Sequence, residues 1–337
     1  MATRHDERAA ALSSHTTVAP RSAMNRPLVA LYDNAPDFVR EAAAPYVTLR
    51  SAAEAEAEPQ GIRGVLSYSP RRPLDASVLG RFPNLQIVAH HGVGYDAVDA
   101  NWCAAHGVVV THTPDVLDAE VADLALGLLL ATVRQIPQAD RYLRAGQWAT
   151  APYPLTTSLQ GREVGIFGLG RIGREIARRV AAFGVAVAYH NRRVLAELPY
   201  RYCASLSALA QTCDVLIVAV PATAQTRHAI SADVLRALGP NGILVNVSRG
   251  SVVDEAALIA ALRSGGILAA GLDVYEHEPT PDPAFATLSN TVLLPHVGSA
   301  SLPTRRAMGQ LVVDNLRAFF EGRGPLTPVP ETPWPRR

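Results

Sequence analysis

Residues 164–184, VGIFGLGRIGREIARRVAAFG, decide the fold that we expect for this chain. A short apolar run leads into three glycines with the spacing GxGxxG, namely Gly168, Gly170 and Gly173, and a segment with helical apolar spacing follows. Between a strand and a helix, the first glycine permits a tight turn, the second lets a pyrophosphate approach the backbone, and the third lets the helix pack on the strand. The helix N-terminus adds N–H donors and a partial positive charge. We therefore predict a dinucleotide site here, in which Arg171 and Ile172 also take part.

Apolar runs and helical segments alternate on both sides of this stretch. Downstream, the runs predict strands at residues 164–167, 185–189, 215–220, 243–247, 267–273 and 291–295. Upstream, they predict strands at residues 28–33, 64–69, 86–92 and 108–114. Such alternation is typical of parallel sheets with helices on both faces. The predicted fold class is α/β, with two Rossmann-like, doubly wound parallel-sheet domains, one flavodoxin-like and one dinucleotide-binding, and a cleft between them.

Composition narrows the class of protein. The 31 basic and 30 acidic side chains give a formal net charge of +1, which offers no support for a nucleic-acid or membrane surface. The three cysteines, Cys103, Cys203 and Cys213, show no CxxC spacing, so we expect reduced, buried thiols, and no metal site is predicted. No apolar run reaches the length of a membrane span, and no secretory signal is apparent. We expect a cytoplasmic protein.

Three side chains with complementary chemistry follow predicted strands in the C-terminal half. Arg249 stands in VNVSRG, Glu278 in YEHEP and His296 in LLPHVGS. Parallel sheets place their chemistry at the carboxyl ends of strands. A guanidinium can hold a carboxylate, an imidazole can transfer a proton near neutral pH, and a carboxylate can orient that imidazole. Taken singly, each residue could equally be structural. Together they predict acid/base chemistry on a small anionic substrate.

The end of the second strand after the glycine turn predicts the kind of dinucleotide. A site for NAD usually has an acidic residue there, which binds the ribose 2′-hydroxyl. Here the position is His190, and Asn191, Arg192 and Arg193 follow it. These three side chains can hydrogen-bond and neutralise a 2′-phosphate, so we predict NADPH, with NADH as a weaker alternative. The other interpretation is a solvated basic turn.

We expect three segments with different roles. Residues 1–26 are polar and are predicted to be a disordered extension, unless Met24 is the true start. Residues 27–117 and 301–337 are expected to form a substrate-binding domain, and residues 118–300 a NAD(P)-binding domain. Within residues 118–148 the pattern predicts a long helix that Asp118 caps and Pro137 interrupts. The Pro-rich tail 325–335 is expected to be a loose arm.

Several ordered motifs resemble the D-isomer-specific 2-hydroxyacid dehydrogenase family. They are HGVGYDAVD (91–99), TPDVLDAEVADLALGLLLA (113–131), GLGRIG (168–173), VNVSRGSVVDEAALIAAL (245–262), GLDVYEHEP (271–279) and LLPHVGSA (293–300). The likeness covers roughly residues 27–322, and an ordered set of motifs is far more specific than any one of them. Within the family, the chain is most similar to glyoxylate and hydroxypyruvate reductases.

The resemblance implies a role for each matched residue. Arg249 would bind the substrate carboxylate and polarise the C2 carbonyl, His296 would donate the proton, and Glu278 would hydrogen-bond the imidazole and keep its protonated form available. Backbone N–H groups of Val93 and Gly94 would hold the substrate carboxylate. The cofactor site would also contain four residues that follow the later strands, Pro221, Val247, Asp273 and Gly298, with Asp273 near the nicotinamide amide.

The implied activity is NADPH-preferring reduction of a small 2-oxoacid, such as glyoxylate or hydroxypyruvate, to the D-2-hydroxyacid. A bulkier substrate such as hydroxyphenylpyruvate is one alternative, and an NAD(H)-sensing, corepressor-like binding protein of the same fold is another. Family members form homodimers through their nucleotide domains. The apolar helix expected at residues 118–133 would suit such an interface, although burial within one subunit would explain it equally well.

Overall fold

The computed structural model describes residues 26–68 and 73–335, so nearly all of the predicted extension lies outside the described residues. The chain divides into two compact units. Among the described residues, unit 1 contains residues 26–68, 73–91, 99–111 and 310–335, and unit 2 contains residues 92–98 and 112–309. Each unit is built on its own parallel sheet. The prediction of two parallel α/β sheets is therefore confirmed.

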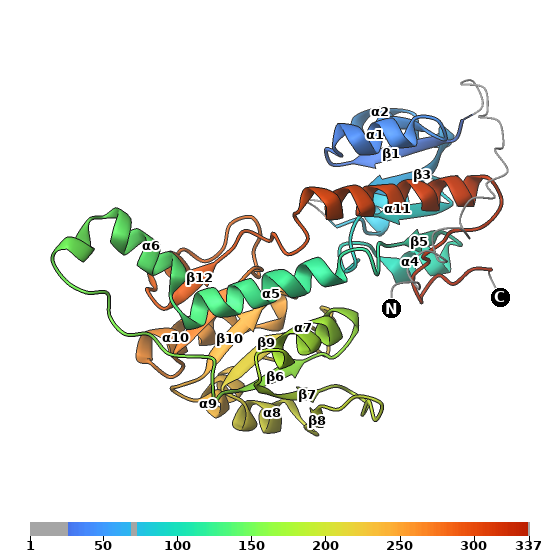
Figure 1. The fold of residues 1–337 in the computed structure, drawn as a ribbon. Coiled ribbons are helices and arrows are strands. Elements are labelled where there is room, and N and C mark those ends of the chain that lie inside the picture. The colour runs from blue at the N-terminus through green and yellow to red at the C-terminus, as the bar shows by residue number, and fades with distance from the viewer. Residues whose placement is uncertain (1–25, 69–72, 336–337) are drawn as a thin grey trace, which may run out of the picture. The chain divides into compact units, whose positions relative to one another are not determined.

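Unit 1 is built on a five-stranded parallel sheet (Figure 1). Its strand order is β2-β1-β3-β4-β5, which is the flavodoxin-like order. The strands are β1 (Leu28–Tyr32), β2 (Thr48–Ser51), β3 (Ile62–Ser67), β4 (Ile87–His90) and β5 (Val109–Thr111). Its helices are α1 (Asp37–Ala43), α2 (Ala52–Ala57), α3 (Ala76–Leu79), α4 (Ala100–Ala105) and the C-terminal part of α11 (Leu302–Phe320). Val312, Val313 and Leu316 of α11 share one core with β1 and β4.

The described part of the C-terminal tail is packed on unit 1, so the expectation of a loose arm is wrong. The backbone N–H of Val329 donates to the Val110 carbonyl (2.9 Å), and the Thr332 hydroxyl accepts from the Val110 N–H (2.9 Å). The Asn315 side-chain oxygen accepts from the backbone N–H groups of Leu326 (2.9 Å) and Thr327 (3.0 Å). The tail covers the outer edge of β5, which would otherwise present unpaired backbone groups.

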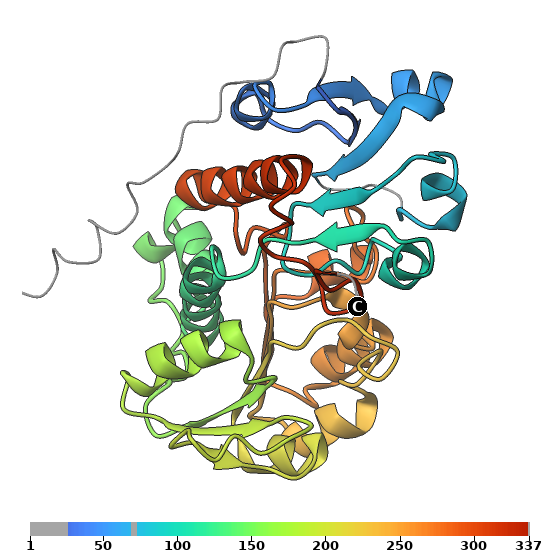
Figure 2. The ribbon, with the colours of Figure 1, turned by 90° about the vertical axis from the view of Figure 1, so that its right-hand side faces the viewer.

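Unit 2 contains a seven-stranded parallel sheet with the order β12-β11-β10-β9-β6-β7-β8. The strands are β6 (Glu163–Phe167), β7 (Ala186–His190), β8 (Arg201–Tyr202), β9 (Val215–Val218), β10 (Ile243–Asn246), β11 (Ala269–Leu272) and β12 (Thr291–Leu293). The helices are α5 (Asp118–Val133), α6 (Ile136–Arg144), α7 (Arg171–Ala181), α8 (Leu206–Thr212), α9 (Ala232–Leu238) and α10 (Glu255–Ser264). Figure 2 shows α5 and α7, in green, on one face and the yellow-to-orange helices on the other.

The chain order reverses beside β6, because β7 lies on one side of it and β9 on the other. In open parallel sheets, ligands bind at the carboxyl ends of the strands beside such a reversal. The glycine turn, which follows β6, lies at this point. The two-residue strand β8 was not predicted, because two residues carry no recognisable periodicity.

The predicted long helix is two helices. α5 ends at Val133, Gln135 adopts a left-handed conformation (φ 50°), and α6 begins at Ile136 with Pro137 in its first turn. The break at Pro137 is confirmed. Asp118, in contrast, is the first helical residue and not the cap, because Leu117 holds the N-cap position. One face of α5 is buried in the core of unit 2, which accounts for its apolar sequence within one subunit.

The three cysteines are buried, free thiols. Burial raises the pKa of both Cys103 and Cys213 to about 12. Over residues 26–68 and 73–335, no helix combines the length and the apolar character needed to cross a membrane.

Candidate active site

The three glycines between β6 and α7 differ in what surrounds them. Gly168 has φ 99°, and a Cβ there would lie 2.6 Å from Val220 Cγ1 and 2.7 Å from the Ala219 carbonyl oxygen. A Cβ at Gly173 would overlap the Gly168 carbonyl oxygen. A Cβ at Gly170 would meet no atom within 4 Å. Two glycines therefore serve the turn and the packing, and the third leaves space at the N-terminus of α7, as a bound pyrophosphate requires.

The turn after β7 is tied to the glycine turn. The Asn191 Oδ1 atom accepts from the backbone N–H of Leu169 at 2.6 Å. Arg192 and Arg193 are exposed, and neither has a carboxylate partner among the residues that the structure describes. His190 ends the strand, with Nδ1 2.9 Å from the Cys203 carbonyl oxygen. The turn thus offers two cationic side chains and no acidic residue beside the ribose position, which fits a phosphorylated ribose.

Glu278 and His296 form a hydrogen-bonded pair. His296 Nδ1 lies 2.6 Å from Glu278 Oε2, and the other carboxylate oxygen accepts from the Tyr275 N–H at 3.0 Å. Burial alone would raise the pKa of Glu278, but the His296 and Tyr275 hydrogen bonds and the charges of His296 and Arg249 bring it below its usual value. Glu278 therefore carries a negative charge at neutral pH. The His296 side chain is 44% exposed, so a small molecule can reach its free ring nitrogen.

Asp273 fixes the turn that carries His296. Its carboxylate oxygens accept from the Val297 N–H and the Gly298 N–H, both at 2.8 Å, and its carbonyl accepts from the His296 N–H at 2.8 Å. Burial raises the pKa of Asp273, and the hydrogen bond from Val297 and the His296 charge oppose the rise. These bonds hold His296 at φ 55°. This structural role was not foreseen from the sequence, and contact with a nicotinamide amide stays a prediction.

Arg249 is oriented by three acceptors. Its Nε atom donates to Asp96 Oδ1 (3.0 Å), Nη1 to the Ser248 carbonyl (2.8 Å) and Nη2 to the Gly94 carbonyl (3.3 Å). A Cβ at Gly94 would overlap the guanidinium, so a larger residue there would displace Arg249 from this position. The Arg249 side chain is 29% exposed. The Val93–Asp96 segment therefore lies against Arg249, within unit 2.

Sequence reasoning missed Asp96 and Asn246. Asp96 lies within the quoted motif HGVGYDAVD, whose carboxylate was the available signal. Asn246 is 1% exposed, and its side chain bonds the Ser248 N–H (3.1 Å) and the Arg249 carbonyl (3.0 Å). An asparagine at the end of a buried strand is unusual. The apolar residues on either side of Asn246 were the signal that its side chain would be buried.

The other predicted residues also follow strand ends. Pro221 follows β9 and is exposed, with its carbonyl accepting from the Thr226 hydroxyl at 2.7 Å. Val247 follows β10 and is 8% exposed. Gly298 lies against the Asp273 carboxylate, which a Cβ would approach to 3.1 Å. In the glycine turn, Arg171 pairs with Asp115 (2.8 Å), and Ile172 packs on the core. Apart from Val93 and Gly94, which follow β4, the candidate residues thus lie at the carboxyl ends of strands of the seven-stranded sheet.

Comparisons with known proteins give one family. Residues 126–298 match the model described as D-isomer specific 2-hydroxyacid dehydrogenase, NAD binding domain. The chain is 48% identical over 256 residues to glyoxylate/hydroxypyruvate reductase A of Arabidopsis thaliana. The aligned region covers 76% of this chain and 82% of the relative. It is 46% identical over 270 residues to hydroxyphenylpyruvate reductase of Plectranthus scutellarioides, covering 80% and 86%.

A solved structure gives the same result. The crystal structure of an NADPH-dependent glyoxylate/hydroxypyruvate reductase from Sinorhizobium meliloti, in complex with NADP and malonate, superposes with a TM-score of 0.89 at 49% sequence identity. The match covers 93% of this chain and 99% of that chain. These findings confirm the family resemblance that the ordered motifs predicted, and with it an NAD(P)-dependent oxidoreductase.

Proposed function

The chain belongs to the D-isomer specific 2-hydroxyacid dehydrogenase family, and from this premise we propose that it reduces a small 2-oxoacid to the D-2-hydroxyacid with NADPH. The observation that carries the proposal is the 2.6 Å pair of His296 and Glu278, in the same unit as Arg249 and the glycine turn. Reduction of a keto acid needs an anion clamp, a polarised carbonyl and a proton donor, and these side chains supply all three.

Each residue acts through a defined atom. The Arg249 guanidinium binds the substrate carboxylate and polarises the C2 carbonyl, aided by backbone N–H groups of Val93 and Gly94. Because His296 Nδ1 is engaged by Glu278, Nε2 is the nitrogen that gives a proton to the C2 oxygen. When bound, the reduced nicotinamide supplies the hydride that goes to C2. The Glu278 carboxylate stabilises the imidazolium before this transfer and orients its ring.

The basic turn supports NADPH as the cofactor. Arg192 and Arg193 are exposed at the end of β7, where a ribose is expected, and Asn191 joins this turn to the glycine turn. Gly168, Gly170 and Gly173 with the N-terminus of α7 would hold the pyrophosphate. The S. meliloti relative, named as NADPH-dependent, supports the same assignment. Pro221, Val247 and Gly298 would line the nicotinamide half.

Glyoxylate and hydroxypyruvate are the proposed substrates. Several relatives carry these substrates in their names, whereas others are named for hydroxyphenylpyruvate and 2-ketogluconate. One methylene changes binding by only about 1–3 kcal/mol, so a measured panel is needed. We would follow absorbance at 340 nm with each oxoacid, using NADPH and then NADH. Turnover with NADPH and glyoxylate or hydroxypyruvate is expected. No turnover with any 2-oxoacid would contradict the enzymatic proposal and favour a binding protein.

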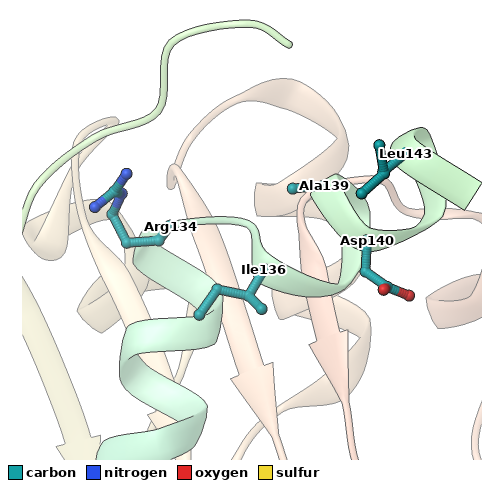
Figure 3. A pocket seen from close by; sticks show the side chains of 5 residues that line it. All are labelled: Arg134, Ile136, Ala139, Asp140 and Leu143. Atoms are coloured by element: carbon teal, nitrogen blue, oxygen red, sulfur yellow. The ribbon is translucent and has the colours of Figure 1, made fainter. Parts of the chain in front are cut away.

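We also propose a homodimer that forms through the segment 134–157. No residue of α6 is buried, and the segment exposes Ile136 (53%), Leu143 (57%), Trp148 (67%) and Leu155 (101%). A hollow of about 490 Å³ lies beside α6. Figure 3 shows the side chains that line it, which are Arg134, Ile136, Ala139, Asp140 and Leu143. A helix gains most of its stability from burying an apolar face, and a second copy would supply that burial.

Light scattering would test the dimer. Leu143→Asp should reduce the mass from that of two chains to that of one, because it puts a charge into the apolar contact. Leu326→Asp is the matched control, since Leu326 is similarly exposed (54%) but lies in unit 1. A wild-type protein with the mass of one chain would contradict the proposal.

A further inference from the structure

The loop that carries Glu278 is held by groups that the reaction itself does not use. It follows β11 and runs from Asp273 to Glu278. A Cβ at Gly250 would overlap the Tyr275 carbonyl carbon and the Glu276 nitrogen. The backbone of this loop is therefore in direct contact with the residue next to Arg249. A displacement of the loop would move Glu278 relative to both Arg249 and His296.

Glu255 is a buried carboxylate that bonds this loop. It is the first residue of α10, is 9% exposed, and its Oε1 accepts from the Glu276 N–H at 2.8 Å. Burial raises the pKa of Glu255, and the Glu276 N–H opposes the rise. The helix does not need it as a cap, because Asp254 Oδ1 already accepts from the Ala257 N–H at 3.0 Å. Burying a carboxylate costs free energy unless the carboxylate is hydrogen-bonded, and the loop N–H supplies that hydrogen bond to Glu255.

The same loop residue is held from its other side. The Glu276 carboxylate accepts from Arg227 Nη2 (2.7 Å) and lies 3.0 Å from His228 Nε2. Two residues on, the loop closes when Glu278 Oε1 accepts from the Tyr275 N–H at 3.0 Å. Glu276 is thus bonded through its backbone to Glu255 and through its side chain to the segment after β9. This arrangement fixes the path of the chain into Glu278.

We propose that Glu255 is a positioning residue for the proton-donor pair, because its buried carboxylate holds the Glu276 N–H and so places Glu278 against His296. The inference rests on the proposed function, in which Glu278 supports His296. In the described structure Glu255 is hydrogen-bonded to the loop backbone and to neither of these side chains, so it acts only through the loop. Substitution of Glu255 should therefore change kcat only through its effect on the position of Glu278.

A double-mutant cycle in the full chain tests this coupling. The variants are Glu255→Ala, Glu278→Gln and the combination, with kcat measured from pH 5 to pH 10 with NADPH and glyoxylate. Glu278→Gln should lower kcat about 100-fold and shift the alkaline fall of the profile to lower pH, since the imidazolium loses its carboxylate partner. Glu255→Ala should lower kcat about 10-fold with a smaller shift in the same direction. Asp273 and Arg249, whose charges act on the pair, and His277, which precedes Glu278, are unchanged in every variant.

In the combined variant, Glu255→Ala should cost almost nothing beyond Glu278→Gln, because coupled residues are not additive. Glu255→Gln should retain most activity, since an amide oxygen can also accept the Glu276 N–H. Asp254→Ala is the matched control, because it weakens the same helix start without touching the loop. It should lower the melting temperature and leave the pH profile in place. If Glu255→Ala does not fold, Glu255→Asp, which shortens the side chain by one methylene, takes its place in the cycle.

The outcomes separate the two hypotheses. If Glu278→Gln retains wild-type kcat and profile, the proposed function of the pair is wrong. If Glu278→Gln behaves as expected, but the Glu255 variant keeps the wild-type profile or its loss adds fully to that of Glu278→Gln, the positioning role is wrong and the proposed function stands. A loss in Asp254→Ala with the same profile shift would also overturn the positioning role, because helix stability would then explain it.

Discussion

In each unit, a histidine at the carboxyl end of the parallel sheet contacts a side chain from the end of the neighbouring strand. In unit 1, His90 ends β4, and its Nδ1 lies 3.1 Å from the hydroxyl of Ser67, which ends the neighbouring strand β3. In unit 2, His296 follows β12, and its Nδ1 lies 2.6 Å from the carboxylate of Glu278, which follows the neighbouring strand β11. His90 is 5% exposed, whereas the His296 side chain is 44% exposed.

Under the proposed function, position at a strand end is not enough to make a histidine a proton donor. A donor needs a partner that stabilises its charged form and a surface that the substrate can reach. His296 has a carboxylate partner and an exposed ring, whereas the His90 ring is buried and cannot be reached by a substrate. The fold supplies equivalent positions in both units, and under the proposed function the local surroundings decide which of them carries chemistry.

The largest expected effect is the loss of His296. His296→Asn should lower kcat by about 10³-fold, because general acid catalysis contributes about 10²–10⁴-fold. Binding of NADPH, followed by fluorescence titration, should change little, since the imidazole acts on the substrate oxygen. His90→Asn should instead lower stability by about 1–3 kcal/mol, because it disturbs a buried hydrogen bond.

The comparison would fail if folded His90→Asn protein lost as much kcat as His296→Asn. Thermal melts at the assay pH would show whether each variant is folded. Loss of NADPH binding in His296→Asn would also contradict its assigned role, because the residue would then belong to the cofactor site.

The second effect concerns two arginine–carboxylate pairs, one chosen from each unit. Arg249→Gln should lower kcat/KM for glyoxylate about 100-fold, since hydrogen bonds to charged groups contribute about 1.5–3 kcal/mol. Asp96→Asn should lower it about 10-fold, because Asp96 only orients the guanidinium (3.0 Å). Arg81 of unit 1, paired with Glu56 at 2.9 Å, is the control. Arg81→Gln should leave kcat/KM within about twofold, as exposed ion pairs contribute little; an equal loss there would remove the distinction between the units.

Whether the role of a site residue could be predicted from the sequence depended on how far apart along the chain its contacts lie. The glycine turn and the three strand-end residues could be predicted, because apolar runs and turn glycines are local signals. The bond from Arg249 to Asp96 could not, since it joins residues 153 positions apart. Glu255 sits at a helix start, where acidic residues are ordinary, and only the folded loop shows its bond to Glu276.

Two errors have the same cause. The Pro-rich tail has the composition of a loose arm, and its packing depends on the unpaired edge of β5. Asp118 has the residue type of an N-cap, but it is buried within the first turn of α5 and Leu117 holds the N-cap position. Composition indicates what a segment can do, and the neighbouring surface decides whether it does so.

The third effect concerns the second strand of each sheet. Replacing Arg192 and Arg193 together by serine should lower kcat/KM for NADPH about 10–100-fold and leave that for NADH within about twofold, because only the 2′-phosphate loses its partners. Arg50, near the end of β2 in unit 1, is the control. Arg50→Ser should not change the ratio of the two cofactors. An unchanged ratio in the double variant would show that the basic turn is only solvated.

The smallest expected effect is on the free energy of unfolding. It contrasts a buried carboxylate that lacks a hydrogen bond on one oxygen with a carboxylate that is hydrogen-bonded on both. Asp118 is 8% exposed, and its Oδ1 has no hydrogen-bond partner in the described structure. Burial, with repulsion from Asp115, raises the pKa of Asp118. A group whose pKa rises on folding stabilises the fold below its unfolded pKa and loses that contribution as pH rises through the folded value. The N-terminal dipole of α5 favours the charge by about 0.3–1 kcal/mol, whereas an orphaned buried polar atom costs about 1–3 kcal/mol, so the cost prevails.

Asp118→Asn should therefore stabilise the protein by about 1 kcal/mol at pH 8, a rise in melting temperature of about 2–4 °C. The gain should shrink toward zero as pH falls below about 4, where the unfolded carboxyl takes up its proton. Glu278→Gln is the opposite case, because the pKa of Glu278 is lowered in the fold and its carboxylate is bonded on both oxygens. That variant should gain nothing at pH 8. Calorimetry of both variants across this range would decide, and a gain in Asp118→Asn that is independent of pH would show that the charge is not its source.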